Sequence, residues 1–183
     1  MLIKPLELER EPLTFHTAIP AGTIEYAPDI TQIGPLNTAG TADLIVEHRG
    51  PHEFVHDIRL RASFNAKFEV LCARCVEPVH ERLKSEFDLI FRPQEADAAS
   101  GERAITEDET EIGYYEESGL LLEDVLREQV LLSLPGRTLC KPDCKGLCPR
   151  CGKNLNQDPC DCASTPVAPR WNALADLGSR LKS

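Results

Sequence analysis

Long hydrophobic runs, aromatic side chains and an N-terminal targeting pattern are missing or scarce in this sequence. No stretch of 18 consecutive apolar residues occurs, which excludes a membrane-spanning helix. The first residues, MLIKPLELEREPL, contain no basic stretch followed by an apolar one, so we expect no secretory signal and a cytoplasmic protein. Aromatic residues make up only 5% of the 183 residues, so we expect a thin hydrophobic core for a chain of one domain or slightly more.

Patterns typical of enzymes are also missing. The five histidines show no HExxH or comparable spacing, whereas a hydrolytic zinc site needs an open position and ligands such as His, Glu or Asp. The dithiol Cys72-Ala-Arg-Cys75 precedes a predicted strand, not the helix that follows a thioredoxin-type redox site. We therefore expect no enzymatic activity and no small-molecule substrate, and we place a redox enzyme or zinc hydrolase last among the hypotheses.

Acidic residues outnumber basic ones, and the excess is concentrated in one segment. The chain has 30 Asp and Glu against 20 Lys and Arg, a net charge of −10. Residues 94–124 alone carry 11 acidic side chains and one basic one, whereas residues 135–183 carry 8 basic and 4 acidic ones. Residues 94–111 are predicted to form an exposed acidic insertion. We interpret it as a solvated loop in preference to a mimic of nucleic acid or a docking site for a basic partner.

Two-residue alternation of apolar and polar side chains predicts an antiparallel sheet. It is clearest from Phe54 to Cys72, and because this run is too long for a flat strand we expect a bend or bulge near residues 63–66. Similar runs cover residues 42–47, before a Gly-Pro turn, and residues 79–92. One face of the sheet should be packed and the other, which carries Asp57 and Arg92, should face water.

One core helix is predicted over residues 120–134. Pro135 and Gly136 end it, and Glu123 and Arg127 are placed to form an i,i+4 ion pair on its wet face. The apolar stripe of this helix consists of Leu122, Val125, Leu126 and Val130.

The fold class that follows is α+β: an antiparallel β-meander or partly closed barrel-like sheet with one core helix and a cysteine-rich, zinc-binding C-terminal segment. We expect residues 1–135 to form the β core with its insertion. We expect residues 136–183 to form a basic, zinc-binding tail that closes with a short helix over residues 170–181.

All eight cysteines fall in close pairs, and this pattern predicts two zinc ions. In a reducing cytosol such pairs bind metal in preference to forming disulfides, and each spacing lets two thiolates face one ion. In the sequence CPRCG, which ends at Gly152, backbone N–H groups should point at the first sulfur while the glycine turns the chain at positive φ. The four pairs are Cys72/Cys75, Cys140/Cys144, Cys148/Cys151 and Cys160/Cys162.

Four pairs can be combined into two four-sulfur sites in three ways. We favour a compact local site made of the two pairs between residues 148 and 162. The pair at residues 72–75 would then join the pair at residues 140–144 in a long-range site, which ties the tip of a hairpin to the segment that leaves the helix. The crossed combinations stay open on sequence grounds.

These residues resemble the YceD-like family of large-subunit ribosomal RNA accumulation proteins, found in bacteria and plastids. The resemblance rests on CARCVEP at residues 72–78, the helix with Leu134-Pro135, CKPDCKGLCPRCGKNLNQDPCDC at residues 140–162, and RWNAL at residues 170–174. It implies a non-catalytic role in the accumulation or processing of large-subunit ribosomal RNA, or in ribosome biogenesis at an early stage of subunit assembly.

Basic side chains within the predicted zinc loops are the candidate partner-binding residues. Zinc-ribbon scaffolds hold such side chains where they can meet phosphates. Because the tail is only weakly basic and the acidic segment repels RNA, either a large-subunit ribosomal RNA precursor or a ribosomal protein fits as partner. A zinc-stabilised assembly factor is our first hypothesis, and a zinc-stabilised protein-interaction module without RNA contact is the second. The candidate residues are Lys141, Lys145, Arg150 and Lys153.

Overall fold

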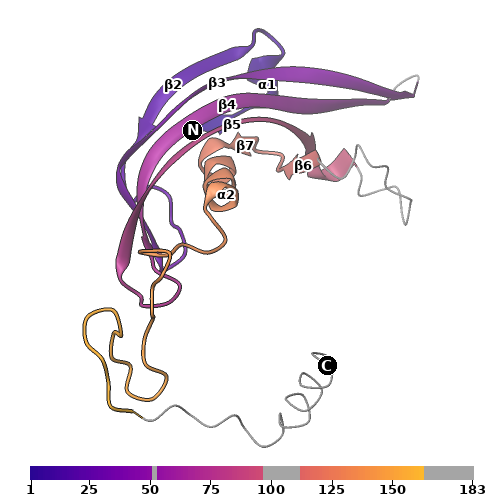
Figure 1. Cartoon of the computed structure of the whole chain (residues 1–183). Helices are drawn as coiled ribbons and strands as arrows, with labels where there is room; N and C mark the ends of the chain where they lie inside the picture. Colours follow the sequence, from indigo (N-terminus) through magenta and orange to yellow (C-terminus); the bar gives the residue numbers. More distant parts are fainter. Residues whose placement is uncertain (51–52, 97–111, 163–183) are drawn as a thin grey trace, which may run out of the picture.

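Three long antiparallel strands form the centre of the fold (Figure 1). In an extended chain every second side chain faces the core, which is why the alternating runs predicted these strands. The computed structural model describes residues 1–50, 53–96 and 112–162. The three strands are β3 (Ile30–Gly50), β4 (Glu53–Leu71) and β5 (Pro78–Pro93).

The sheet has further strands at both sides and is mixed. β2 (Leu13–Ile19) pairs with β3 in the antiparallel sense, whereas β6 (Ile112–Tyr115) pairs with β5 in the parallel sense. Residues 94–111 separate β5 from β6, and a connection of this length permits a parallel neighbour where a tight hairpin does not. β2 to β5 follow one another as the expected antiparallel meander. Among the described residues β2 and β6 end the sheet and do not pair with each other, so the sheet is not closed.

The irregularity that accompanies the curvature lies in β3. Residues 34–36 of β3 oppose the single residue Ala66 of β4, while β4 stays in register with β5. Gly34 has a φ of 74°, which suits glycine, and Pro35 has no N–H to give to the ladder. The bulge predicted near residues 63–66 therefore occurs at the expected level of the sheet, but in the partner strand.

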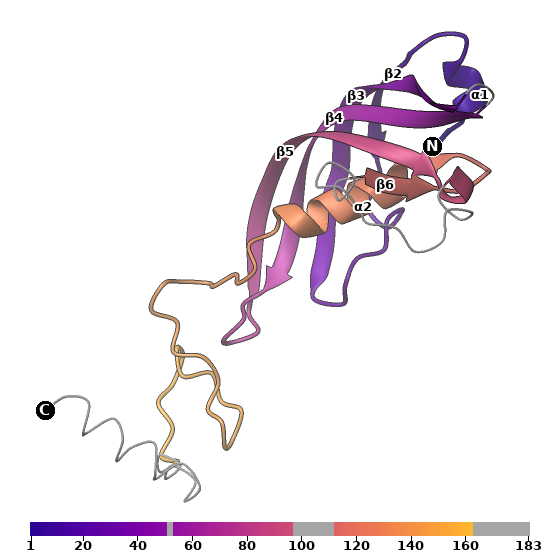
Figure 2. The ribbon, with the colours of Figure 1, turned by 90° about the vertical axis from the view of Figure 1, so that its right-hand side faces the viewer.

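The hydrophobic core lies between the concave face of the sheet and helix α2 (Leu122–Ser133), as Figures 1 and 2 show. The helix ends before Pro135, as predicted. Its buried side chains share one core cluster with the inward side chains of β4, among them Phe64 and Phe68. The four residues of the predicted apolar stripe are all buried, with exposed fractions between 0 and 3%.

Helix α2 begins two residues later than predicted because β7 (Leu120–Leu121) precedes it and pairs with β1 (Leu2–Ile3). The predicted ion pair between Glu123 and Arg127 is wrong. Glu123 instead binds the N-terminal ammonium group, and Arg127 donates to the carbonyl oxygen of Glu25. Tertiary neighbours thus replace the local pair.

Two short helical turns complete the described elements. Helix α1 (Pro5–Leu8) lies before β2, and the 3-10 turn η1 (Gln94–Ala96) follows β5 at the start of the predicted acidic insertion. The rest of that insertion and the predicted terminal helix lie outside the described residues.

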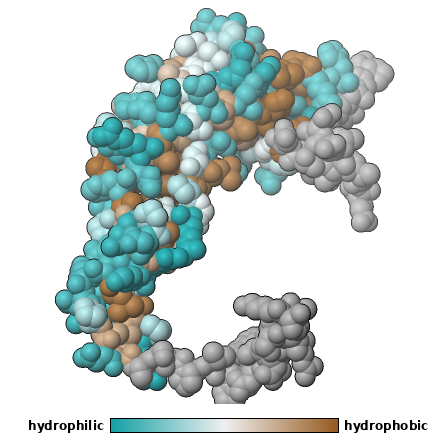
Figure 3. Space-filling model, in the orientation of Figure 1, coloured by the Kyte–Doolittle hydropathy of each residue, from teal (hydrophilic) through white to brown (hydrophobic). Residues whose placement is uncertain are grey.

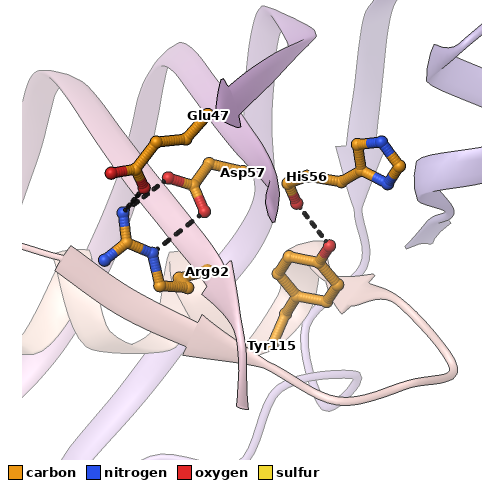
Figure 4. A network of polar contacts seen from close by, with 5 residues as sticks. All are labelled: Glu47, His56, Asp57, Arg92 and Tyr115. Atoms are coloured by element: carbon orange, nitrogen blue, oxygen red, sulfur yellow. Dashed lines mark hydrogen bonds and ion pairs between the residues drawn. The ribbon is translucent and has the colours of Figure 1, made fainter. Parts of the chain in front are cut away.

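Asp57 and Arg92 form a buried ion pair on the face of the sheet that was expected to face water (Figure 4). Arg92 donates to Asp57 at 3.2 and 2.9 Å and to Glu47 at 2.6 Å, and Asp57 and Arg92 are each only 4% exposed. Nearby, Tyr115 donates its hydroxyl to the carbonyl oxygen of His56 at 2.6 Å, and burial raises the pKa of Tyr115 to about 12. Alternation indicates the face that a side chain takes but not whether that face is covered, so the expectation for this pair was wrong.

Within the described part of the chain, none of the helices has the length and apolar character needed to cross a membrane.

Candidate metal centres

The eight cysteines gather into two groups of four, the combination that the sequence analysis favoured. Within each group the sulfur atoms all lie within 4.8 Å of one another. Neither crossed combination occurs in the described structure. The first group is Cys72, Cys75, Cys140 and Cys144, and the second group is Cys148, Cys151, Cys160 and Cys162.

The first group joins the tip of the β4–β5 hairpin to the segment that follows α2. The Sγ atoms of Cys72 and Cys144 are 3.8 Å apart, and those of Cys75 and Cys140 are 3.5 Å apart. Four sulfurs at about 2.3 Å from a tetrahedral zinc ion would be about 3.8 Å from one another. The observed spacing therefore fits a zinc ion bound by four sulfurs.

Both CxxC sequences form the same backbone turn. In the first group the N–H of Val76 donates to the carbonyl oxygen of Cys72, and the N–H of Cys72 donates to that of Glu77, both at 2.9 Å. In the second group the N–H of Gly152 donates to the carbonyl oxygen of Cys148 at 2.9 Å, and the N–H of Cys148 donates to that of Lys153 at 2.8 Å. The two metal-binding turns are thus equivalent in backbone geometry.

The residue after the second cysteine of each turn has a left-handed backbone. Gly152 takes a φ of 72°, as predicted, and Val76 takes a φ of 62°. Glycine adopts this conformation without strain, whereas a β-branched residue does so at a cost. Val76 is 54% exposed, so packing of its side chain offsets little of this strain energy. The turn around the sulfurs holds this strained conformation.

Backbone N–H groups prepare the first sulfur of the first group to be a thiolate. Burial by itself raises the pKa of Cys72, but N–H groups of Cys140, Cys75 and Arg74 outweigh it and lower the pKa to about 6. The N–H of Cys140 lies 3.4 Å from this sulfur. Burial and neighbouring thiols raise the pKa of Cys140 to about 12.

The second group shows the same contrast. N–H groups of Cys151 and Arg150 lower the pKa of Cys148 to about 6. Contacts with the sulfurs of Cys151 and Cys148 raise the pKa of Cys162 to about 12. Four thiolates at this spacing repel one another, and a divalent cation removes that repulsion. Each group is therefore built to be fully ionised only around a cation.

Two asparagines of the second loop support the first group. The amide of Asn156 donates to the sulfur of Cys144 at 3.2 Å and accepts the N–H of Lys145 at 2.9 Å. Asn154 accepts from Asn156 and donates to Glu77 of the first turn at 3.1 Å. Sequence reasoning missed both residues, for which the only signal was their place between two cysteine pairs. Such contacts orient ligands around a metal.

The four predicted partner-binding residues are all exposed on the cysteine-rich segment, drawn in orange to yellow in Figure 1. Lys153 lies 3.6 Å from Asp158, and the other three have no ion-pair partner within the described ranges. Arg74, which the prediction did not include, lies in the first turn and donates to the carbonyl oxygen of Cys144 at 2.6 Å. A basic side chain of the hairpin tip is thus fixed to the basic segment.

A family model described as "Large ribosomal RNA subunit accumulation protein YceD" matches residues 60–178. The chain belongs to the YceD family. The matched region contains all eight cysteines and the core helix, so the resemblance noted in the sequence is confirmed.

Relatives of this YceD family member come from mycobacteria. Uncharacterized proteins of Mycobacterium tuberculosis and Mycobacterium bovis are each 35% identical over 106 residues, which is 58% of this chain and 48% of the relative. An uncharacterized protein of Mycobacterium leprae is 25% identical over 187 residues, covering 96% of this chain and 79% of the relative. The chain spans about half the length of the M. tuberculosis and M. bovis relatives. No solved structure matches it.

Proposed function

We propose that this YceD family member is a non-catalytic factor in large-subunit ribosomal RNA accumulation, stabilised by two zinc ions. The family description supports a role with large-subunit ribosomal RNA. The two four-cysteine groups support the binding of two metal ions. The position of the first group carries the proposal, because an ion there would tie the β4–β5 hairpin tip to the basic segment after α2. The proposal places the protein in the cytoplasm, where bacterial ribosomes assemble.

The eight cysteines would hold the two ions as closed four-thiolate sites. Soft thiolate ligands in tetrahedral geometry suit zinc, and such sites leave no open position for a substrate. The metal would supply folding free energy, since metal binding and ordering of the surrounding loop are one equilibrium. The role proposed for the sites is therefore structural.

The basic side chains of the cysteine-rich segment would provide the contact with RNA. Lys141, Lys145 and Arg150 are exposed and have no ion-pair partner in the part of the chain that the structure describes. Loops held by zinc would present them in a fixed arrangement, and each phosphate contact releases counterions from the RNA. Residues 94–124 carry a net charge of −10, so RNA contact should be confined to the basic end.

A four-residue neutralisation tests this proposal. Replacing Lys141, Lys145, Arg150 and Lys153 by glutamine should reduce association with large-subunit precursor particles about tenfold or more. If RNA is contacted directly, the salt dependence should also become shallower by about three units in the log–log slope. The zinc content should not change, because none of the four is a ligand.

The matched control neutralises four exposed basic residues of the β core: Lys4, Arg10, Arg61 and Lys67. This variant carries the same change in net charge and should associate as the wild type does. Wild-type association and wild-type levels of large-subunit RNA in the first variant would refute the proposed function.

A zinc-stabilised protein-interaction module without RNA contact is the second candidate. The chain as a whole is acidic, which favours a basic protein over RNA as a partner for surfaces other than the cysteine-rich segment. In that case the four-residue variant should associate as the wild type does, whereas deletion of residues 94–109 should weaken association with the particle.

A further inference from the structure

Within the described residues, the outer edge of β5 has no strand partner along most of its length. β6 pairs with β5 only from Ile90 to Pro93, and no other described strand pairs with that edge between Pro78 and Leu89. Figure 2 shows β6 beside only one end of β5. Peptide groups of an edge strand that point away from the sheet lack ladder partners, and they can pair with another extended chain.

A hollow of about 830 Å³ lies where this edge meets β6 and α2. Consecutive residues of β5, from Asp88 to Phe91, line it, together with Glu128, Gln129 and Leu132 of the helix. Neighbouring residues of a strand point to opposite faces, so a hollow on one face would be lined by alternate residues. Because both faces contribute, the hollow lies beside the strand, where the next strand of the sheet would run.

The helix side of this hollow is apolar. Leu132 is 71% exposed although it is a leucine of a core helix, and it faces the hollow together with Phe91 and Ile112. Figure 3 shows hydrophobic surface in the region of α2, on the concave side of the sheet. A side chain that entered between β5 and α2 would bury this surface.

The charge available in the hollow is negative. Glu128 has no ion-pair partner in the described residues, and it also lines an adjoining hollow of about 380 Å³ together with Glu116 and Asp124. Arg59 is the one basic residue that lines either hollow. It is neutralised by Asp88 through two hydrogen bonds of 2.8 and 2.6 Å. The site therefore complements a cation.

We propose that the β5 edge and α2 bind an extended, positively charged segment of a partner protein by strand addition. The backbone of that segment would pair with residues 84–89, in line with β6, and alternate side chains would pack on Leu132. Its lysines and arginines would meet Glu128, and Glu116 and Asp124 in the adjoining hollow. This inference rests on the proposed function in large-subunit ribosomal RNA accumulation, and it adds a basic protein of the precursor particle as a second partner beside RNA.

A synthetic peptide tests the proposal on the full chain. The probe is a labelled octapeptide of alternating lysine and valine, whose binding is followed by fluorescence anisotropy. It should bind at least about tenfold more tightly than the glutamate–valine peptide. Amide hydrogens of residues 84–89 should exchange at least about tenfold more slowly in the complex. A lysine–valine peptide that is N-methylated at alternate residues keeps its charge but cannot form the ladder, so it should lose most of its affinity.

A charge reversal with a matched control locates the site. Glu128→Lys should weaken binding of the lysine–valine peptide about tenfold, whereas Glu9→Lys, an equal change at an exposed residue after α1, should leave it unchanged. Full affinity of the N-methylated peptide, or no effect of Glu128→Lys, would overturn the proposal.

Other occupants of the edge give distinct results, each of which also overturns the proposal. Edge amides already protected in the free monomer would indicate the chain's own acidic segment. A dimer abolished by Glu128→Lys would indicate a second copy, and RNA that protects residues 84–89 would indicate nucleic acid. The four-residue variant of the cysteine-rich segment should bind the peptide normally, so failure of this inference is separable from failure of the proposed function.

Discussion

At the scale of single residues, Val76 and Gly152 occupy equivalent positions in the two metal-binding turns. Both take left-handed backbone conformations, with φ values of 62° and 72°. A non-glycine residue pays roughly 1–2 kcal/mol there, and the exposed side chain of Val76 offers little packing in return. The first turn is thus strained and the second is not.

Exchanging the two residue types should change stability in opposite directions. Val76→Gly should leave the free energy of unfolding unchanged or raise it by up to about 1 kcal/mol, because relief of strain exceeds the added chain entropy. Gly152→Val should lower zinc affinity about tenfold, since a strained turn then holds the second group. Denaturant unfolding and competition with a zinc chelator measure these effects. A clear loss of stability in Val76→Gly would contradict the strain argument.

The ionisation of the cysteines makes proton release a second measurable quantity. The pKa of Cys72 is lowered to about 6 and that of Cys140 is raised to about 12. At pH 7.5 the first is already a thiolate, whereas the second must lose a proton to bind metal. Because one thiol of each group is already ionised at this pH, zinc binding to the reduced apo protein should release fewer than four protons per ion.

Calorimetry in buffers of different ionisation enthalpy measures this release. The lowered pKa also affects the stability of the apo protein: the contribution of the Cys72 thiolate is complete above the ordinary thiol value of 9.0 and is lost as the pH falls through about 6. Because protons compete with the metal for the thiolates, zinc affinity should fall as the pH is lowered. Release of four protons per ion at pH 7.5 would show that the N–H groups do not prepare the first sulfur.

At the scale of elements, the sequence predicted what depends on local periodicity. The alternation from Phe54 to Cys72 located β4, and the stripe from Leu122 to Val130 located α2, because both patterns come from side chains that face one core. β2 was missed, and the parallel pairing of β6 was not foreseen. Pairing partners are chosen by tertiary contacts, which a local pattern does not contain.

The candidate metal centres were likewise predictable from the sequence only where the pattern is local. Cysteine spacing located both groups because each pair is local and its geometry is restrictive. Asn154 and Asn156 were missed because their contacts join separate loops. The burial of Asp57 and Arg92 was missed because alternation indicates which face of the strand a side chain takes, but not whether other residues bury that face.

The two cysteine groups connect elements over very different distances along the chain, and this predicts unequal effects on stability. The first group joins Cys75 to Cys140, which are 65 residues apart, while the second group lies within one short segment. Cys75→Ser should lower the melting temperature of the β core, because a long loop is no longer closed. Cys160→Ser should leave the core transition almost unchanged. Equal losses, followed by thermal unfolding of the sheet, would show that the second group also stabilises the core.

At the scale of the whole molecule, charge is separated between two regions. The cysteine-rich segment carries the exposed basic side chains, and the β5–β6 end with α2 carries acidic ones. In the two proposals, RNA would bind to the first region and a basic polypeptide to the second. The first cysteine group determines how the two regions are joined, because it connects the sheet to the segment that follows α2.

The account depends most directly on the presence of metal in both cysteine groups. Elemental analysis of protein purified in reducing buffer without chelator should find about two zinc ions per chain. X-ray absorption at the zinc edge should find four sulfur neighbours at about 2.3 Å and no nitrogen or oxygen ligand. Zinc near zero in fully reduced protein, or a coordination shell with fewer than four sulfurs, would contradict the central claim.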